Sequence, residues 1–211
     1  TESEHVMLMG DGAEEFARQH GFEMMDPDYF ATDFRWQQLQ RIQAGEKASA
    51  DTETNDNKDR WFSTVGAVAL DHRGNLVAGT STGGTSNKRW GRVGDSPIIG
   101  AGTYARNGSC AVSATGNGEY FIRHVVAYNI CNRVELGSPV AEAADTVVND
   151  VLVKAGGEGG VIAIDQQGNI ATAFNSEGMY RASIDADGEM KILIYREPGE
   201  PEGAFAGTVE H

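Results

Sequence analysis

The sequence predicts an α+β fold, in which helices cover an antiparallel sheet. Short apolar runs joined by glycine-containing turns are typical of β-hairpins. One such unit spans residues 64–82, and a second spans 161–174. Two segments with the apolar spacing of amphipathic helices, 119–136 and 138–151, lie between them. The order of strands, then helices, then strands indicates α+β layering.

The amino-acid composition argues against two classes of partner, nucleic acids and membranes. The 211 residues suffice for one domain of ordinary size or two small ones. There are 17 Lys and Arg against 31 Asp and Glu, a net charge of −14, and such an acidic surface repels phosphate backbones. No apolar run approaches the roughly 20 residues that a membrane-spanning helix needs. We therefore expect neither nucleic acid nor a membrane as a partner.

The first 44 residues predict one strand and two helices. The apolar run 5–9 is typical of a strand. Apolar residues recur at helical spacing over 12–20, just before Gly21, and more loosely over 28–43. Each of these two segments is predicted to be a helix.

Residues 45–63 are polar and charged and have no hydrophobic period. Such a segment cannot bury enough apolar surface to offset the entropy cost of ordering. We expect a flexible linker, of the kind that proteases cut most readily.

Two further strands are predicted after the linker, over 110–114 and over 190–195. The helix over 138–151 is predicted to have Ser138 as its N-cap and Pro139 at its first position.

Thr64 is a candidate nucleophile because it directly follows the predicted linker. Cleavage between Ser63 and Thr64 would place a hydroxyl and a free α-amine on one residue. An α-amine has a pKa of about 7.7–8.0, so part of it is neutral at physiological pH and can accept the hydroxyl proton. The alternative is a structural threonine that opens a strand, as its β-propensity favours.

Arg92 and Asp95 lie in a glycine-framed loop, residues 91–97. A guanidinium suits a carboxylate and a carboxylate suits an ammonium, so the two side chains match the charged ends of an α-amino acid. The alternative is a surface salt bridge between them, worth under about 1 kcal/mol.

Two glycine-rich segments are candidates for binding through backbone N–H groups. Residues 114–119 end a strand and open a helix, where N–H groups and the Thr115 hydroxyl are natural donors to an oxyanion, although a capped turn explains them equally well. Residues 79–84 have no Gly-Lys-Ser/Thr sequence and no following helix, so a phosphate-binding loop is only weakly indicated and a simple turn is equally plausible.

The cysteines and histidines show no metal-ligand spacing, so no metal site is predicted. The two cysteines, Cys110 and Cys131, suggest no disulfide framework either. A reducing compartment fits this cysteine usage, and a cytoplasmic location is expected.

Six motifs carry a resemblance that runs nearly from end to end. They are TVGAVALD (64–71), TSTGG (80–84), GRVGDSP (91–97), GAGTYA (100–105), ATGNGE (114–119) and FNSEGMYRA (174–182). In these motifs and their order, the chain resembles the plant-type asparaginases and isoaspartyl peptidases, a family of N-terminal-nucleophile hydrolases of the threonine type.

The resemblance implies an autoprocessing amidohydrolase that acts on β-aspartyl (isoaspartyl) dipeptides and L-asparagine through an acyl-enzyme. Thr64 would be the nucleophile, freed by self-cleavage after Ser63, and Thr82 would hydrogen-bond it. Family members usually carry glycine before the nucleophile, so Ser63 is expected to slow or block self-cleavage.

The remaining site residues are also implied by the resemblance. Arg92 and Asp95 would hold the α-carboxylate and α-amine of the substrate. Thr115 and Gly116 would form the oxyanion hole, and Gly118 would line the same pocket.

The resemblance also implies a four-layer αββα sandwich formed by a single domain over 1–211. Residues 1–44 would be the C-terminal part of an α subunit, 45–63 the linker and 64–211 the β subunit. These αβ heterodimers would assemble as a dimer of heterodimers. The family's opening His-Gly-Gly strand and alkali-cation loop have no counterpart in the sequence, so an incomplete sandwich is expected. No cofactor is expected, apart from an alkali cation held through that N-terminal segment.

Two rival functions are consistent with the motifs. Glycosylasparaginases share the sequences at 92–95 and 115–118, but usually have TSTNG in place of TSTGG and carry disulfides. Two lone cysteines and the segment 178–181 favour the isoaspartyl peptidase branch. The second rival is an unprocessed or truncated inactive homologue that acts as a binding subunit, for which no cleavage after Ser63 is expected.

Overall fold

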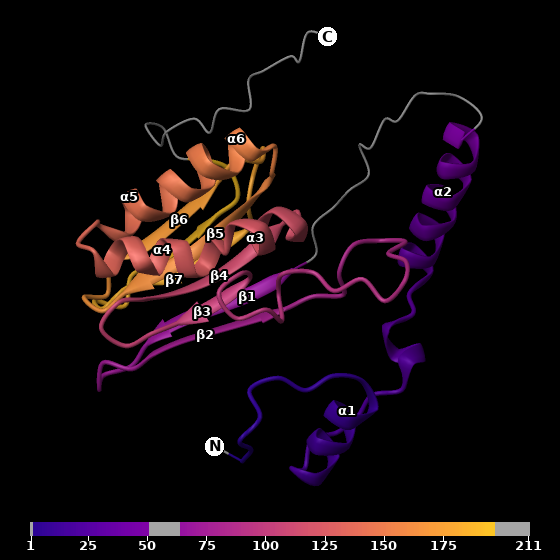
Figure 1. Ribbon diagram of the computed structural model, residues 1–211, viewed down its shortest axis with the longest axis horizontal. Helices are drawn as coiled ribbons and strands as arrows, with labels where there is room; N and C mark the ends of the chain where they lie inside the picture. The colour runs from indigo at the N-terminus through magenta and orange to yellow at the C-terminus, as the bar shows by residue number, and fades with distance from the viewer. Residues whose placement is uncertain (1, 51–63, 197–211) are drawn as a thin grey trace, which may run out of the picture. The chain divides into compact units, whose positions relative to one another are not determined.

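The structure is a computed structural model that describes residues 2–50 and 64–196. The chain divides into two compact units, with the boundary between residues 59 and 60. Both are drawn in Figure 1, and each is described here by itself. Helix and antiparallel sheet occur together, which confirms the predicted α+β class.

The first unit is helical. It contains α1 (Gly10–Gln19), the 3₁₀ turn η1 (Pro27–Phe30) and α2 (Asp33–Ala50). The helix predicted over 12–20 is confirmed as α1. The strand predicted over 5–9 is wrong, because these residues form no regular element and no neighbouring strand is described in this unit to pair with them.

The helix predicted over 28–43 is divided in two. The Thr32 hydroxyl accepts a hydrogen bond from the Arg35 N–H at 3.3 Å, so α2 starts afresh with a side-chain cap. The helix then continues to Ala50, so residues 45–50, predicted as linker, are helical. The rest of the predicted linker, residues 51–63, lies outside the described residues.

The second unit is built around a four-stranded antiparallel sheet in the order β3-β4-β5-β6. Its strands are β3 (Thr103–Ala105), β4 (Cys110–Gly116), β5 (Gly159–Asp165) and β6 (Ile170–Phe174). Two separate hairpins complete the strands: β1 (Val65–Leu70) with β2 (Leu76–Ser81), and β7 (Arg181–Ile184) with β8 (Met190–Leu193). Strands β3 and β7 were not predicted; both are short.

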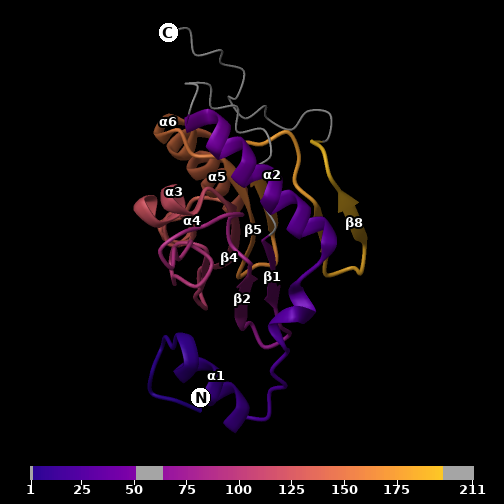
Figure 2. The same cartoon turned by 90° about the vertical axis from the view of Figure 1, so that its right-hand side faces the viewer.

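Helices cover one face of the central sheet and the β1–β2 hairpin covers the other (Figures 1 and 2). The helices are α3 (Gly118–His124), α4 (Val126–Glu135), α5 (Val140–Asp145), the π-helical segment η2 (Thr146–Leu152) and α6 (Val153–Ala155). Strand β4 is therefore buried on both faces. Val112 and Ala114 belong to the apolar core under the helices, whereas Ser113 faces the hairpin.

The helix predicted over 119–136 is interrupted at Val125, whose φ is +48°. The N–H groups of Ala127 and Tyr128 donate to the carbonyls of Ala101 and Gly100, at 3.1 and 2.8 Å, instead of to the preceding helical turn. Tertiary hydrogen bonds thus end α3 and start α4. In the next helical segment Pro139 is the N-cap, so the predicted Ser138 cap is wrong.

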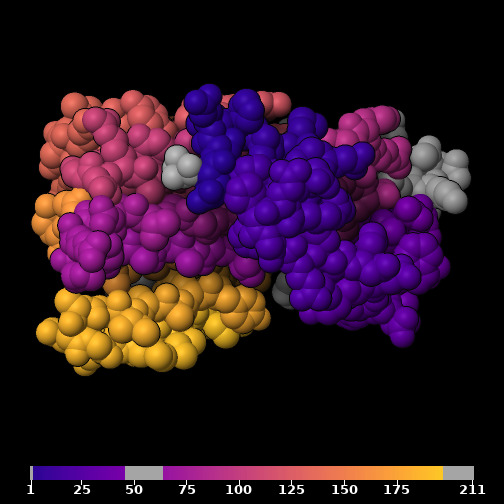
Figure 3. Space-filling model, turned by 90° about the horizontal axis from the view of Figure 1, so that it is seen from below, coloured from indigo at the N-terminus to yellow at the C-terminus, as the bar shows by residue number. Residues whose placement is uncertain are grey.

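The two hairpins lie on one face of the second unit, with β1–β2 in purple and β7–β8 in yellow (Figure 3). Both expose apolar side chains, including Val65, Val77, Ile184 and Ile192 at 59–72% of their full areas. Among the described residues of this unit, no element covers these side chains.

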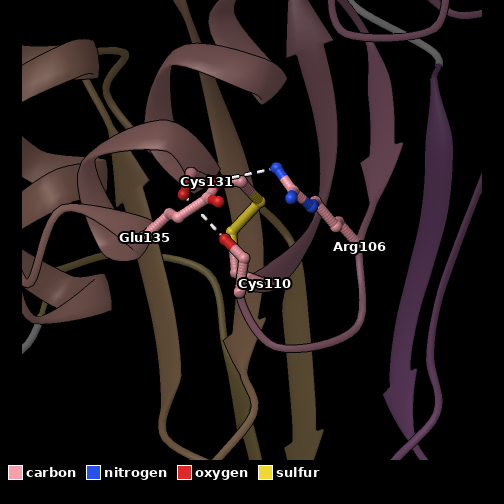
Figure 4. The surroundings of a disulfide bond; sticks show 5 residues. Arg106, Cys110, Cys131 and Glu135 are labelled. Atoms are coloured by element: carbon pink, nitrogen blue, oxygen red, sulfur yellow. Dashed lines mark hydrogen bonds and ion pairs between the residues drawn. A yellow bond between two sulfur atoms is a disulfide. The ribbon is translucent and has the colours of Figure 1, made fainter.

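A disulfide joins Cys110 at the start of β4 to Cys131 in α4 (Figure 4). Both cysteines are buried, and the Ser109 hydroxyl donates to the Cys131 carbonyl at 2.7 Å. An ion pair between Arg106 and Glu135 lies beside the disulfide. The prediction of unpaired cysteines is therefore wrong, and it no longer supports a reducing compartment.

Over the described ranges 2–50 and 64–196, no helix combines the length and the apolar character that crossing a membrane requires.

Candidate active site

Thr64 and Thr82 meet at the open end of the β1–β2 hairpin. Val65 pairs with Ser81, so the residues just outside the ladder, Thr64 and Thr82, lie opposite each other. The Thr64 hydroxyl donates to the Thr82 hydroxyl oxygen at 3.0 Å. That oxygen also accepts the Gly84 N–H at 3.0 Å, which fixes it in place. The structure thus brings together the two threonines singled out in the sequence.

The hairpin presents this pair to the central sheet. Thr80 lies in β2, two residues before Thr82. Its hydroxyl is 2.6 Å from the Ser113 hydroxyl, and this hydrogen bond joins β2 to β4. Side chains two apart in a strand share a face, so Thr115 lies on the same face of β4 as Ser113. Strand β1 begins at the end of the sheet where β4 ends (Figure 1). Thr115 and the Thr64–Thr82 pair therefore lie on facing surfaces of two packed layers.

Gly116 ends β4 in a conformation that favours glycine, with φ +153°. A Cβ atom here would lie 2.4 Å from the Glu158 carbonyl oxygen and 2.8 Å from the Gly159 Cα. The next residue, Asn117, donates its N–H to the Glu158 carbonyl at 2.9 Å. The turn between β4 and α3 is therefore held against the start of β5 by backbone contacts.

Arg92 is paired with Glu119, a residue that the sequence analysis did not assign to the site. The Nε and Nη2 atoms of Arg92 donate to the two carboxylate oxygens at 2.8 and 2.9 Å. This bidentate ion pair raises the pKa of Arg92 further above its ordinary value. Glu119 ends the ATGNGE motif, so its type and place were visible, but its partner 27 residues away was not.

Asp95 is 5% exposed, and its Oδ2 atom has no hydrogen-bond partner among the described residues. Burial raises the pKa of this carboxyl; the Arg92 guanidinium opposes that rise and the Glu119 carboxylate adds to it. A buried carboxyl with an unused oxygen is suited to accept hydrogen bonds from an ammonium group.

Gly118 separates these two charged side chains. A Cβ atom at this position would lie 2.8 Å from the Asp95 Oδ1 atom and 2.9 Å from the Arg92 Nη2 atom. Glycine thus lets both side chains pack against this position, where any Cβ atom would clash with them. Arg92, Asp95 and Gly118 form one cluster, and Gly118 follows Thr115 and Gly116 closely in the chain.

Ser63, the predicted residue before the cleavage point, lies outside the described residues. Over residues 2–50 and 64–196, no group of three or more His, Cys, Asp or Glu side chains is arranged to hold a metal ion.

Comparisons with known proteins agree with the resemblance seen in the motifs. The family described as Asparaginase matches residues 1–194. The isoaspartyl peptidase of Escherichia coli is 49% identical over 202 residues, covering 94% of this chain and 63% of the relative. That of Salmonella typhimurium is 49% identical over 197 residues, covering 92% and 63%. The mouse isoaspartyl peptidase/L-asparaginase is 39% identical over 180 residues, covering 85% and 54%. The chain thus spans less than two thirds of the length of these relatives.

Proposed function

The chain belongs to the asparaginase family, and from this premise we propose that it carries the catalytic residues of an autoprocessing hydrolase for β-aspartyl dipeptides and L-asparagine. The relatives named above are isoaspartyl peptidases, one of them also an L-asparaginase. The hydrogen bond between Thr64 and Thr82 supports the proposal most directly, because it orients the hydroxyl that would react.

Cleavage of the peptide bond between Ser63 and Thr64 would give Thr64 a free α-amine. This amine accepts the proton of the Thr64 hydroxyl, and Oγ1 attacks the side-chain carbonyl carbon of the substrate. Thr115 and Gly116 stabilise the resulting oxyanion. The C–N bond then breaks, ammonia or an amine leaves with the proton, and an ester on Thr64 remains. Water hydrolyses that ester to release aspartate and restore the hydroxyl.

The charged cluster would hold the other end of the substrate. Asp95 accepts the α-ammonium with its unpartnered oxygen, and Arg92 donates to the α-carboxylate with the guanidinium hydrogens that Glu119 leaves free. Because Glu119 already neutralises Arg92, the cluster carries a net negative charge that suits an ammonium. The nucleophile, the base and the oxyanion donors are all protein groups, so the reaction needs no cofactor.

We also propose the family's four-layer sandwich and its dimer of αβ heterodimers. The helical layer, the central sheet and the hairpins of the second unit correspond to three of the four layers. The exposed apolar side chains of the hairpins, such as Val65 and Ile192, would be covered by the fourth.

Because Cys110 and Cys131 form a disulfide, the cysteines no longer support the expected cytoplasmic location.

The test is release of ammonia from L-asparagine and of the free amino acid from a β-aspartyl dipeptide by the full natural protein. We expect both reactions, and we expect Thr64→Ala to reduce each at least about 10³-fold. Thr172→Ala, which removes a threonine hydroxyl from the edge strand β6, is the matched control and should keep full activity. Equal activity of Thr64→Ala and wild type would contradict the proposal.

The disulfide leaves glycosylasparaginase as a second candidate, since lone cysteines were one reason to disfavour it. Assay with a glycosylated asparagine separates the two. Turnover of that substrate faster than of a β-aspartyl dipeptide would favour the second candidate.

A further inference from the structure

Asn175, directly after β6, uses its whole side chain to bind backbone groups. It is 2% exposed. Its Oδ1 atom accepts the Gly159 N–H at 2.7 Å, and its Nδ2 atom donates to the carbonyls of Gly157 and Val148 at 2.9 and 3.3 Å. Its own N–H donates to the Gly159 carbonyl at 3.0 Å. A buried amide with both donor hydrogens and its oxygen engaged is held in one orientation.

The Val148 carbonyl connects this amide to the helical layer. Val148 belongs to the π-helical segment η2, in which helical hydrogen bonds run to the fifth residue along instead of the fourth. Asn175 supplies a donor there. Its side chain therefore ties the start of β5 to η2 as well as to the end of β6.

The held segment, residues 157–159, supports the turn that carries Thr115 and Gly116. Gly116 pairs with Gly159 across the ladder, and Asn117 donates to the Glu158 carbonyl at 2.9 Å. A Cβ atom on Gly159 would lie 2.3 Å from the Thr115 carbonyl oxygen. Because backbone rests directly on backbone, a shift of Gly159 is transmitted to Thr115 and Gly116.

We propose that Asn175 is a positioning residue: by fixing residues 157–159, it places the donors of Thr115 and Gly116 at the developing oxyanion. This inference rests on the proposed function. It assigns to Asn175 an effect on the rate of the chemical step, beyond its effect on stability.

The test compares Asn175→Ala with Asp165→Ala in the full natural protein, with rates normalised to the cleaved fraction measured by intact mass. Asp165 is a matched control: it is 4% exposed, its side chain accepts three hydrogen bonds, and it lies at the opposite end of the β4–β5 ladder. We expect Asn175→Ala to lower kcat on the order of 10²-fold with KM within about threefold, as for a misplaced oxyanion donor. Asp165→Ala should keep kcat within about twofold.

Asn175→Asp guards against a variant that fails to fold. Its carboxyl keeps an acceptor for the Gly159 N–H, so it should recover at least about tenfold of the kcat lost in Asn175→Ala. If Asn175→Ala is recovered only as aggregate, Asn175→Asp is compared with wild type, and a loss of kcat of about tenfold is expected. The proposal is overturned if kcat stays within threefold of wild type in Asn175→Ala, or in Asn175→Asp where only that variant folds. It is also overturned if Asp165→Ala loses as much kcat as the Asn175 variant.

Hydrogen exchange separates this proposal from the proposed function. In Asn175→Ala, the amides of residues 115–118 should exchange at least about tenfold faster than in Asp165→Ala. If the wild type hydrolyses neither substrate, the proposed function fails, and the exchange result alone decides whether Asn175 positions this turn. Unchanged exchange at 115–118 overturns the proposal.

Discussion

In the proposed function, three charged side chains determine what the candidate site binds. Arg92 and Glu119 form a bidentate ion pair, whereas Asp95 is buried with one oxygen that has no hydrogen-bond partner among the described residues. A buried carboxyl with one unpartnered oxygen destabilises the free protein, and such groups are commonly retained where a ligand completes them. We therefore regard Asp95 as the residue whose ionisation governs binding.

The pH dependence of KM tests this. Burial raises the pKa of Asp95, so as the pH falls, the carboxylate is lost earlier than an ordinary aspartate would be. KM for L-asparagine, whose side chain does not titrate, should rise as the pH falls through that raised pKa. Asp95→Asn should have a high KM that does not change over this range. If KM instead rises only as the pH falls through the ordinary pKa of an aspartate, Asp95 is not the group that governs binding.

The raised pKa of Asp95 also makes the stability of the protein depend on pH in a definite direction. Because the folded-state pKa lies above the unfolded one, ionisation of Asp95 lowers stability as the pH rises through it. Asp95→Asn should therefore melt at the same temperature as wild type or higher at pH 7, as thermal unfolding would show. A large drop in Tm would indicate a structural role instead.

At the scale of elements, the close approach of the β1–β2 hairpin to β4 determines where Thr64 lies. A Cβ atom on Gly66 would lie 1.9 Å from the Ser113 Oγ atom, and Ser113 in turn bonds Thr80. Small residues at this contact let the two layers meet closely enough for hydroxyls to join them.

Gly66→Ala should force the layers apart. We expect a loss of about 1–3 kcal/mol in the free energy of unfolding, as for other overpacked sites, together with lower activity. Gly79→Ala, on the paired strand with no atom within 4 Å of the added Cβ, is the matched control and should be neutral. Denaturant titration of both variants measures the difference; equal stabilities would contradict this packing.

The disulfide joins β4 to α4 across a sequence separation of 21 residues. Closing a loop of this size stabilises a protein by roughly 3 kcal/mol through the unfolded state. Replacing Cys110 and Cys131 together with alanine should lower the free energy of unfolding by about that amount and leave kcat unchanged, because the disulfide is at the start of β4 and the site at its end. A matching loss of kcat would contradict that separation.

Local patterns predicted the elements that local interactions form. The hairpins around residues 71–75 and 165–169 follow from short strands joined by glycine turns, and β6 ends at Phe174, where the second hairpin unit was predicted to end. The break at Val125 was missed because carbonyls of Gly100 and Ala101, distant in sequence, impose it. The pairings of Arg92 with Glu119 and of Cys110 with Cys131 were missed for the same reason. The Thr64–Thr82 pair was expected because the family motifs carried that long-range information.

At the scale of the whole molecule, the boundary between the two compact units, between residues 59 and 60, lies close in sequence to the proposed cleavage point between Ser63 and Thr64. The chain matches the asparaginase family over residues 1–194 and spans less than two thirds of its named relatives. Within the second unit, Thr64 directly precedes the first strand. Cleavage before Thr64 would therefore leave both the β1–β2 hairpin and the Thr64–Thr82 hydrogen bond intact.

Intact-mass spectrometry of the purified full natural protein shows directly whether Thr64 becomes an N-terminal residue. We expect a fragment that begins at Thr64 in the wild type, and no such fragment from Thr64→Ala. Incubation series with wild type and Ser63→Gly show whether Ser63 slows the cleavage. A protein that hydrolyses β-aspartyl dipeptides while its chain stays unbroken at Ser63–Thr64 would contradict the claim that Thr64 acts as an N-terminal nucleophile.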